Sequence, residues 1–78
     1  LIAPEGKVVL EIGAGDGRLT REILNLNPKR IYAVELDPRW LNELVGVSDT
    51  RLHVIEGDIR RIQFPSDVDV VVGNLPYY

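Results

Sequence analysis

The sequence of 78 residues predicts an α/β fold in which an open parallel sheet carries a ligand site. Short apolar runs that suit strands alternate with amphipathic stretches that suit helices. The apolar runs are nearly continuous, which is typical of strands covered on both faces. Polar residues with useful chemistry follow the ends of these runs. Because ligands of open α/β sheets collect at the carboxyl ends of the strands, this placement predicts a binding site there.

The first predicted strand and helix flank a glycine-rich turn. Residues 8–12 form an apolar run that suits a strand, and residues 13–17 suit a tight loop. Residues 18–26 place leucine and isoleucine at helical spacing, so a helix is expected there. This helix should end at Asn27-Pro28, because a proline does not continue a helix.

The remaining elements repeat the alternation of strand and helix. Residues 30–35 predict a second strand. Asp37-Pro38 is typical of a helix N-cap followed by proline at the first helical position, so a second helix is expected next. The later elements are a third strand over residues 52–56, a short helical or irregular segment over residues 59–64 and a fourth strand over residues 68–72. Strands in this order are joined by right-handed crossovers.

Composition limits the classes of protein to which the chain can belong. Apolar residues make up 45% and charged residues 27%, as in a globular domain, and no run approaches the roughly 18 apolar residues of a membrane span. The absence of cysteine excludes a disulfide framework and a thiolate metal site, and fits a reducing cytoplasm. Nine basic and twelve acidic residues give a net charge of −3. If the protein acts on nucleic acid, most of the surface that grips phosphate is expected elsewhere.

The chain contains no methionine and begins at Leu1. We therefore expect it to be an excised piece of a longer protein.

The first candidate binding motif is Glu11-Ile12-Gly13-Ala14-Gly15-Asp16-Gly17. Glycines let the backbone turn sharply and approach a ligand closely. The last two glycines are one residue closer together than in the dinucleotide fingerprint G-x-G-x-x-G, so a loop beside a nucleoside fits better than a pyrophosphate clamp. A purely structural turn is the alternative.

Two carboxylates follow the second and third predicted strands. Glu35 can accept hydrogen bonds from both hydroxyls of a ribose, and a dinucleotide fold places an acid at a similar distance from its glycine loop. Asp58 can accept from the amine of an adenine, with Leu36 and Ile59 as apolar flanks of the ring. The alternatives are a solvated acid at position 35 and a helix N-cap at position 58.

The last five residues, Asn74-Leu75-Pro76-Tyr77-Tyr78, follow the fourth predicted strand. The Asn74 carbonyl and a backbone carbonyl freed by the kink at Pro76 can accept from an exocyclic amine. Tyr77 can stack on the ring, and such stacking contributes roughly 1–3 kcal/mol. The motif suits a flat ring that carries an amino group, although an ordinary turn after a strand has a similar composition.

Other polar residues are expected to be structural. His53 lies in the middle of a predicted strand without a second histidine or a cysteine to share a metal. Trp40 is expected to pack its helix against the sheet. The sequence contains no nucleophile–base–acid triad and no clustered set of metal ligands, so no metal site is predicted.

Four blocks in this order resemble a known family: residues 11–17, Val34-Glu35-Leu36-Asp37, Gly57-Asp58-Ile59 and residues 74–78. They are similar to the class I S-adenosylmethionine-dependent methyltransferases and, among these, to the ribosomal RNA adenine N6,N6-dimethyltransferases. The resemblance covers the whole chain and implies a Rossmann-like three-layer sandwich. It implies a partial parallel sheet of order 3-2-1-4 with helices on both faces. Residues 1–78 would be an N-terminal part of the catalytic domain, truncated at both ends.

The resemblance also implies roles for individual residues. Those matching the glycine loop line the methionine part of S-adenosylmethionine, Glu35 and Asp58 hold the ribose hydroxyls and the adenine amine, and Asn74, Pro76 and Tyr77 grip the target adenine. Methyl transfer to N6 is then mainly positioning of two reactants, with the target base flipped out. The full set of implied cofactor contacts is Glu11, Gly13, Ala14, Gly15, Gly17, Glu35, Leu36, Asp58, Ile59 and Asn74.

The resemblance implies ribosomal RNA as partner, bound through the longer parent protein in the cytoplasm and mostly by parts absent here. Methyl transfer is expected from the parent, not from this piece alone. A strand order of 3-2-1-4 would leave residues 68–72 as a bare apolar edge, so we expect self-association through that strand. The alternatives are a methyltransferase for DNA adenine or protein glutamine, a nicotinamide-dependent oxidoreductase and a non-catalytic self-associating fragment.

Overall fold

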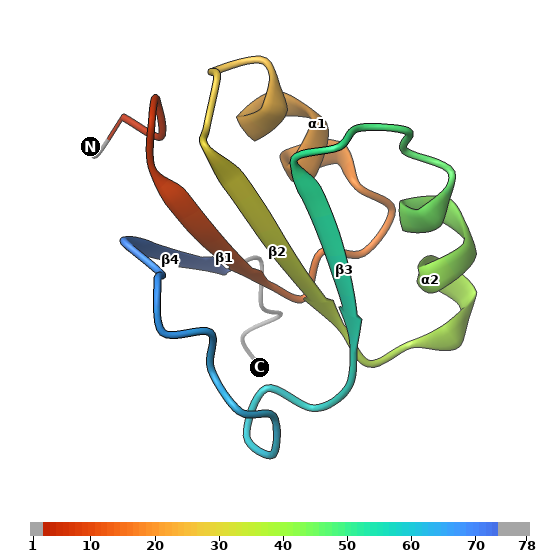
Figure 1. Ribbon diagram of the computed structural model, residues 1–78. Helices are drawn as coiled ribbons and strands as arrows, with labels where there is room; N and C mark the ends of the chain where they lie inside the picture. Colours follow the sequence, from red (N-terminus) through yellow and green to blue (C-terminus); the bar gives the residue numbers. More distant parts are fainter. Residues whose placement is uncertain (1–2, 74–78) are drawn as a thin grey trace.

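The computed structural model describes residues 3–73, which fold into a four-stranded parallel sheet and two helices (Figure 1). The strand order is β3-β2-β1-β4, which confirms the predicted order. The elements are β1 (Val8–Ile12), α1 (Arg18–Leu24), β2 (Arg30–Glu35), α2 (Pro38–Val45), β3 (Leu52–Glu56) and β4 (Val70–Gly73). Each predicted strand is present, but β4 begins two residues later and ends one residue later than predicted, and α1 ends two residues earlier than the sequence pattern indicates.

The register aligns the carboxyl ends of all four strands. Ile12 at the end of β1 pairs with Val34 of β2 and with Gly73 of β4. Glu35 at the end of β2 pairs with Glu56 at the end of β3. The loops that follow the first three strands therefore leave the sheet side by side at one edge.

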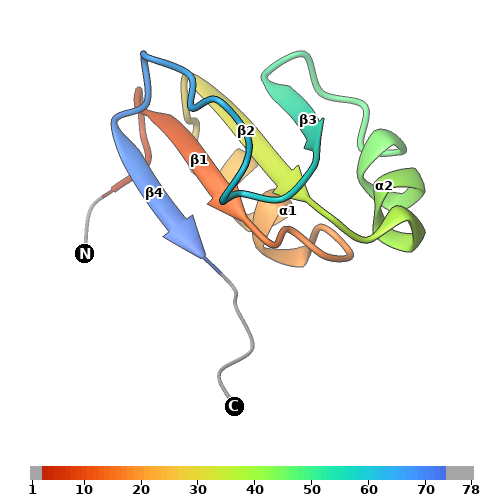
Figure 2. The same cartoon turned by 90° about the horizontal axis from the view of Figure 1, so that it is seen from below.

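Both helices lie on one face of the sheet, which corrects the expectation of helices on both faces. Figure 2 shows α1 on one side of the strands and the segment 57–69 crossing on the other. The crossovers from β1 to β2 and from β2 to β3 run in the same direction, and right-handed connections then place both helices on the same face. The direction reverses before β4, and within residues 3–73 the reversed crossover contains turns but no helix. Gly57 and Pro65 bracket this stretch, and neither residue continues a helix.

The core consists of two clusters beneath the helices. Ile23 and Leu24 of α1 pack on Val9 and Ile31 of the central strands. The second cluster joins Leu44 of α2 with Ala33 and Ala14. These contacts fix both helices to strands β1 and β2, whose carboxyl ends carry the predicted site.

The two helices begin in different ways. Asp37 caps α2 as predicted, since its side chain accepts from the Arg39 backbone N–H at 2.9 Å and Pro38 occupies the first turn. The cap of α1 is Gly17, which has a φ of +86° and no side-chain cap. A Cβ at Gly17 would lie 3.2 Å from Arg21 Nη1 and 3.4 Å from Leu44 Cδ2. Glycine is thus required by the left-handed backbone, and a Cβ there would in addition crowd the Arg21 side chain.

In the part of the chain that the structure describes, no helix has the length and apolar character to cross a membrane.

Candidate functional site

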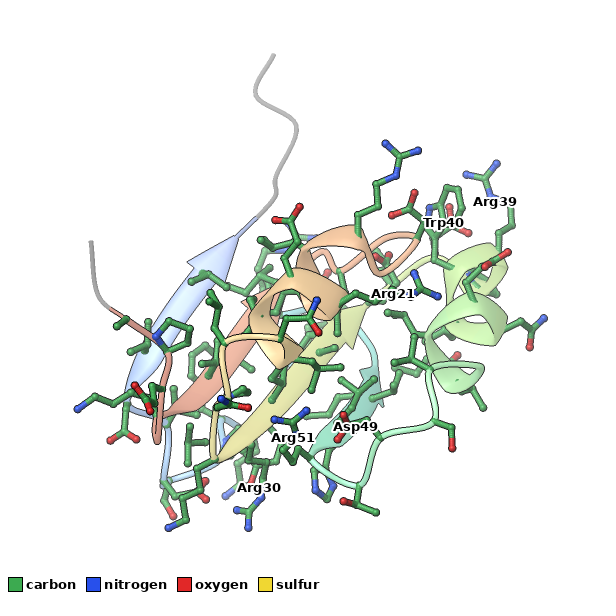
Figure 3. The ribbon with its side chains drawn as sticks, turned by 90° about the horizontal axis from the view of Figure 1, so that it is seen from above. Arg21, Arg30, Arg39, Trp40, Asp49 and Arg51 are labelled. Carbon is green, nitrogen blue, oxygen red and sulfur yellow. The ribbon has the colours of Figure 1, made fainter. Side chains whose placement is uncertain are left out.

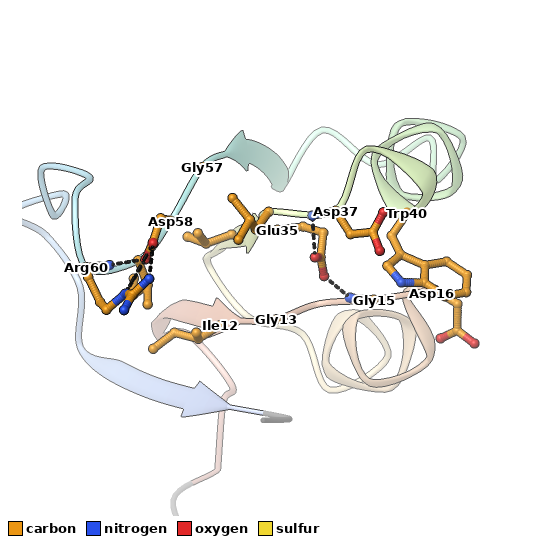
Figure 4. A pocket seen from close by; sticks show the side chains of 13 residues that line it. Ile12, Gly13, Gly15, Asp16, Glu35, Asp37, Trp40, Gly57, Asp58 and Arg60 are labelled. Atoms are coloured by element: carbon orange, nitrogen blue, oxygen red, sulfur yellow. Dashed lines mark hydrogen bonds and ion pairs between the residues drawn. The ribbon is translucent and has the colours of Figure 1, made fainter. Parts of the chain in front are cut away.

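A cavity of about 570 Å³ opens at the carboxyl ends of β1, β2 and β3 (Figure 4). Three loops line it: the glycine loop after β1, the residues that lead from β2 into α2, and the turn after β3. Its volume lies within the roughly 300–1,000 Å³ typical of small-molecule sites. The cavity combines apolar walls with a few converging polar groups, which is the usual character of such a site.

Glu35 lies at the centre of the cavity wall and ties two loops together. Its Oε1 accepts from the Gly15 backbone N–H at 2.7 Å, and its Oε2 accepts from the Asp37 backbone N–H at 2.9 Å (Figure 4). A carboxylate offers about four lone-pair sites, so these two bonds leave two free. Glu35 therefore positions the loop and can still accept from a ligand in the cavity.

The glycine loop is anchored at its start and open where it meets the cavity. The backbone N–H groups of Gly13 and Ala14 both donate to the Val34 carbonyl, at 2.9 and 3.4 Å. Gly15 has a φ of +58°, and the nearest atom to a Cβ there would be the Gly13 carbonyl oxygen at 3.9 Å. Glycine at position 15 is thus needed for the backbone conformation, and the space beside it is left to a ligand.

Asp58 lies in the turn after β3 and is held by Arg60. Its carboxylate accepts from the Arg60 backbone N–H at 2.9 Å and from the guanidinium Nη2 at 2.6 Å. These bonds with Arg60 lower the pKa of Asp58 to about 2. Asp58 is therefore an ionised acceptor at neutral pH. It also caps its turn, because the Arg61 and Ile62 backbone N–H groups donate to the Asp58 carbonyl at 2.8 and 3.1 Å.

Glu11 lies behind the glycine loop and does not line the cavity. It is fully buried, and its Oε1 accepts from the Thr20 hydroxyl of α1. Among residues 3–73 no hydrogen-bond partner is found for its Oε2. Burial raises the pKa of Glu11, although the bond from Thr20 opposes the shift, and the nearby Glu35 raises it further. Glu11 thus links β1 to α1 from the core side.

The structure brings together most of the predicted cofactor residues. Six of them line the cavity: Gly13, Gly15, Glu35, Leu36, Asp58 and Ile59. Glu11, Ala14 and Gly17 do not line it, and both Glu11 and Ala14 are buried. Asn74, Pro76 and Tyr77 lie outside the described residues.

Trp40 is a cavity residue that the sequence pattern did not indicate. Its side chain is 37% exposed and lines the cavity beside Asp37 and Asp16 (Figure 4), so the expectation that it packs α2 on the sheet is wrong. Its place in the first turn of α2, directly after a strand end, is a signal that could have located it.

His53 lies within β3, with its ring centroid 5.6 Å from that of Tyr32. No group of three or more His, Cys, Asp or Glu side chains suited to a metal is found in residues 3–73.

The fold and the site together define an open α/β protein with a cavity at the carboxyl edge of its sheet, where carboxylate groups can accept hydrogen bonds. The whole described sheet shares its fold with an S-adenosylmethionine-dependent methyltransferase from Mesorhizobium loti, with a TM-score of 0.83 at 17% identity over 94% of this chain and 34% of that one. The family model for ribosomal RNA adenine dimethylase matches residues 2–78. This chain belongs to the ribosomal RNA adenine dimethylase family.

Two relatives illustrate this membership. The chain is 44% identical to ribosomal RNA small subunit methyltransferase A of Rhizobium etli, over 94% of this chain and 29% of the relative. It is similar to the solved structure of a dimethyladenosine transferase from Plasmodium falciparum, with a TM-score of 0.79 and 33% identity over 96% of this chain and 29% of that one. The chain therefore spans less than a third of the length of the curated relatives that it matches.

Proposed function

We propose that the chain is the S-adenosylmethionine-binding portion of a cytoplasmic ribosomal RNA methyltransferase that acts on adenine N6. The proposal depends on one observation: the glycine loop, Glu35 and Asp58 meet in the same cavity at the ends of three strands. The names of the matched relatives support ribosomal RNA as the substrate of the parent protein.

The lining of the cavity fits this cofactor. The two free lone-pair sites of Glu35 suit a pair of ribose hydroxyls. Asp58 is an ionised acceptor for an adenine amine, and Leu36 and Ile59 offer apolar contact to the ring. The glycine loop leaves open space for the methionine part. The lining thus offers acceptors to the ribose and the adenine amine, apolar contact to the ring, and space for the methionine part.

S-adenosylmethionine, when bound, supplies an electrophilic methyl group on a sulfonium. The contribution of the chain is to hold and orient the reactants, which can account for a large part of a rate enhancement. Gly73 pairs with Ile12, so β4 ends next to the start of the glycine loop, and the sequence continues directly into Asn74. We assign to Asn74 and the Pro76 carbonyl the orientation of the target amine, and to Tyr77 the stacking of the target base.

Titration calorimetry with S-adenosylmethionine and its demethylated product, S-adenosylhomocysteine, tests the proposal directly. Both should bind at one site, and NAD should not, because the loop is a residue shorter than a pyrophosphate clamp requires. Binding of NAD without binding of S-adenosylmethionine would instead favour the oxidoreductase alternative. Methyl transfer to RNA is expected only from a longer protein that includes the rest of the domain.

The proposal includes self-association of this chain through β4. Within residues 3–73, β4 is an edge strand that pairs only with β1, and Val71 on it is exposed. An apolar groove of about 200 Å³ lies beside this edge, lined by Val70, Val72 and residues of α1. An apolar edge strand without charges is a template for pairing with another chain.

Light scattering at high micromolar concentration should find dimers or larger species. Val71→Lys should shift the chain towards monomer, because a lysine on an edge strand disfavours edge-to-edge pairing. Val45→Lys, at an exposed position on α2, is the control and should leave the association unchanged. A strictly monomeric wild-type chain would contradict this part of the proposal.

A further inference from the structure

Four Asp-x-Arg turns recur in the chain. In each, the aspartate accepts from the backbone N–H of the arginine two residues later and forms an ion pair with its guanidinium. The pairs are Asp16–Arg18, Asp37–Arg39, Asp49–Arg51 and Asp58–Arg60. Three of them follow β1, β2 and β3 at the carboxyl edge of the sheet, whereas the Asp49–Arg51 turn precedes β3 at the opposite edge.

The arginines at the two edges differ in exposure. The side chains of Arg18, Arg39 and Arg60 are 88%, 80% and 82% exposed, and that of Arg51 is 33% exposed. Arg18 and Arg39 lie at the starts of α1 and α2, and Arg60 lies in the turn after β3. Arg60 itself lines the cavity, and Figure 4 shows it at one end and Trp40 at the other. A turn alone would explain all four pairs, but it does not explain why three exposed guanidinium groups share the edge of the sheet at which the cavity opens.

Trp40 completes this rim. Its ring is partly exposed, and the guanidinium carbon of Arg39 lies 5.9 Å from the ring centroid (Figure 3). Exposed arginines next to an exposed aromatic side chain are the combination with which proteins bind single-stranded nucleic acid. The cations follow the backbone, and a base stacks on the ring.

The ion pairs do not prevent this use. Exposed salt bridges contribute little to stability, so exchanging a carboxylate for a phosphate costs little. Arg39 donates to Asp37 through Nε and Nη2, and a guanidinium has five N–H donors in all. The remaining donors can bind a phosphate while the turn keeps the arginine in place, and arginine matches the geometry of phosphate better than lysine does.

We infer that Arg18, Arg39, Arg60 and Trp40, here called the rim, bind a single-stranded segment of RNA across the mouth of the cavity. The arginines contact backbone phosphates, and one base stacks on Trp40. This inference rests on the proposed function, since it names a surface that would present the RNA substrate to the cofactor cavity. It also modifies the expectation from net charge, because part of the phosphate-binding surface then lies on this acidic chain.

The test measures the affinity of the chain for an unstructured RNA oligonucleotide by fluorescence anisotropy at increasing salt, with S-adenosylhomocysteine present. For single strands the slope of log K against log salt is about −0.7 per phosphate neutralised, so the triple variant Arg18→Gln, Arg39→Gln, Arg60→Gln should flatten the slope by about 2. The matched control Lys29→Gln, Arg30→Gln, Arg51→Gln removes three cations at the opposite edge and should keep the slope. The variant Arg18→Lys, Arg39→Lys, Arg60→Lys should keep most of the slope, because the three positive charges remain.

The single tryptophan of the chain gives a second readout. RNA should quench its fluorescence in the cofactor-saturated chain, and Trp40→Ala should weaken RNA binding about tenfold, within the range of base stacking. Equal slopes for the rim and control variants, in chains with wild-type circular dichroism, would overturn the inference.

Calorimetry with S-adenosylhomocysteine on the wild-type chain, read together with the salt slopes of the variants, separates the two proposals. Cofactor binding with an unchanged salt slope would refute the rim alone. A flattened slope without cofactor binding would support the rim and refute the proposed function.

Discussion

The two sides of the glycine loop hold one buried glutamate each, and the two differ in what their oxygens contact. Glu35, on the cavity side, accepts from two backbone N–H groups. Glu11, on the core side, accepts from one hydroxyl and has no partner among the described residues for its second oxygen. The two lie on neighbouring strands and point to the same face of the sheet. The comparison teaches that a buried carboxyl group can have either of two roles here: Glu35, held by backbone donors, lines the cavity, whereas Glu11 links β1 to α1 in the core.

The largest effect is expected at Glu35. Glu35→Ala removes both loop anchors and both ribose acceptors, and should weaken S-adenosylmethionine binding by about 1.5–3 kcal/mol, as for hydrogen bonds to charged groups. Calorimetry with the 2′-deoxy analogue of S-adenosylhomocysteine separates the two roles. The wild-type chain should prefer the parent compound, and the variant should bind both alike. A variant that still discriminates between them would remove the ribose role.

A smaller effect is expected at Glu11, where a substitution should raise the stability of the chain and not lower its affinity for the cofactor. Because the pKa of this acid is raised in the folded state, the folded chain holds the proton more tightly than the unfolded chain does. The free energy of unfolding should therefore fall as pH rises above the ordinary pKa of a glutamate, until Glu11 is ionised. Glu11→Gln removes this loss while the amide oxygen still accepts from Thr20.

Chemical denaturation at several pH values measures this difference. The Glu11→Gln variant should match the wild type near pH 4 and be more stable than it at neutral pH, because the amide has no proton to lose. Cofactor affinity should stay nearly unchanged. A variant that is less stable at neutral pH would show that Glu11 is needed as a charged group.

The smallest effect is expected at Asp58. Asp58→Asn replaces an acceptor of the adenine amine with a side chain that also donates. Preference for S-adenosylhomocysteine over its inosine counterpart should fall by about 0.5–1 kcal/mol, the net value of an ordinary hydrogen bond. Competition between the two compounds at pH 7, where a pKa of about 2 keeps Asp58 ionised, measures the change. An unchanged preference would remove the adenine role.

Most of the fold could be predicted from the sequence, because each strand of this sheet has its own apolar run. The bounds of the first three strands, the Asp37 cap and the meeting of Glu35 with Gly15 all follow from local signals and the rule for strand ends. The direction in which Glu11 points relative to the loop depends on how α1 packs, and the sequence does not encode that locally. The same holds for Trp40, whose exposure is set by the space between two loops.

The rim was missed for a related reason. Arg18, Arg39 and Arg60 are isolated along the chain, and only the shared edge of the sheet brings them together. Nothing in the local sequence marks them as a group, because about twenty residues separate each arginine from the next.

The central position of β1 has a consequence for the order in which the chain folds during synthesis. β1 leaves the ribosome before the other described strands, yet its second neighbour, β4, is the last of them. The β1–β4 junction is closed by the Asp69 backbone N–H, which donates to the Val8 carbonyl at 2.8 Å, and by the Val8 N–H, which donates to the Asp69 carboxylate at 2.9 Å. Such long-range pairing is slow to form, because a long loop must close before the contact is made. The edge of β1 that pairs with β4 therefore stays open to solvent until β4 has been synthesised and has left the ribosome.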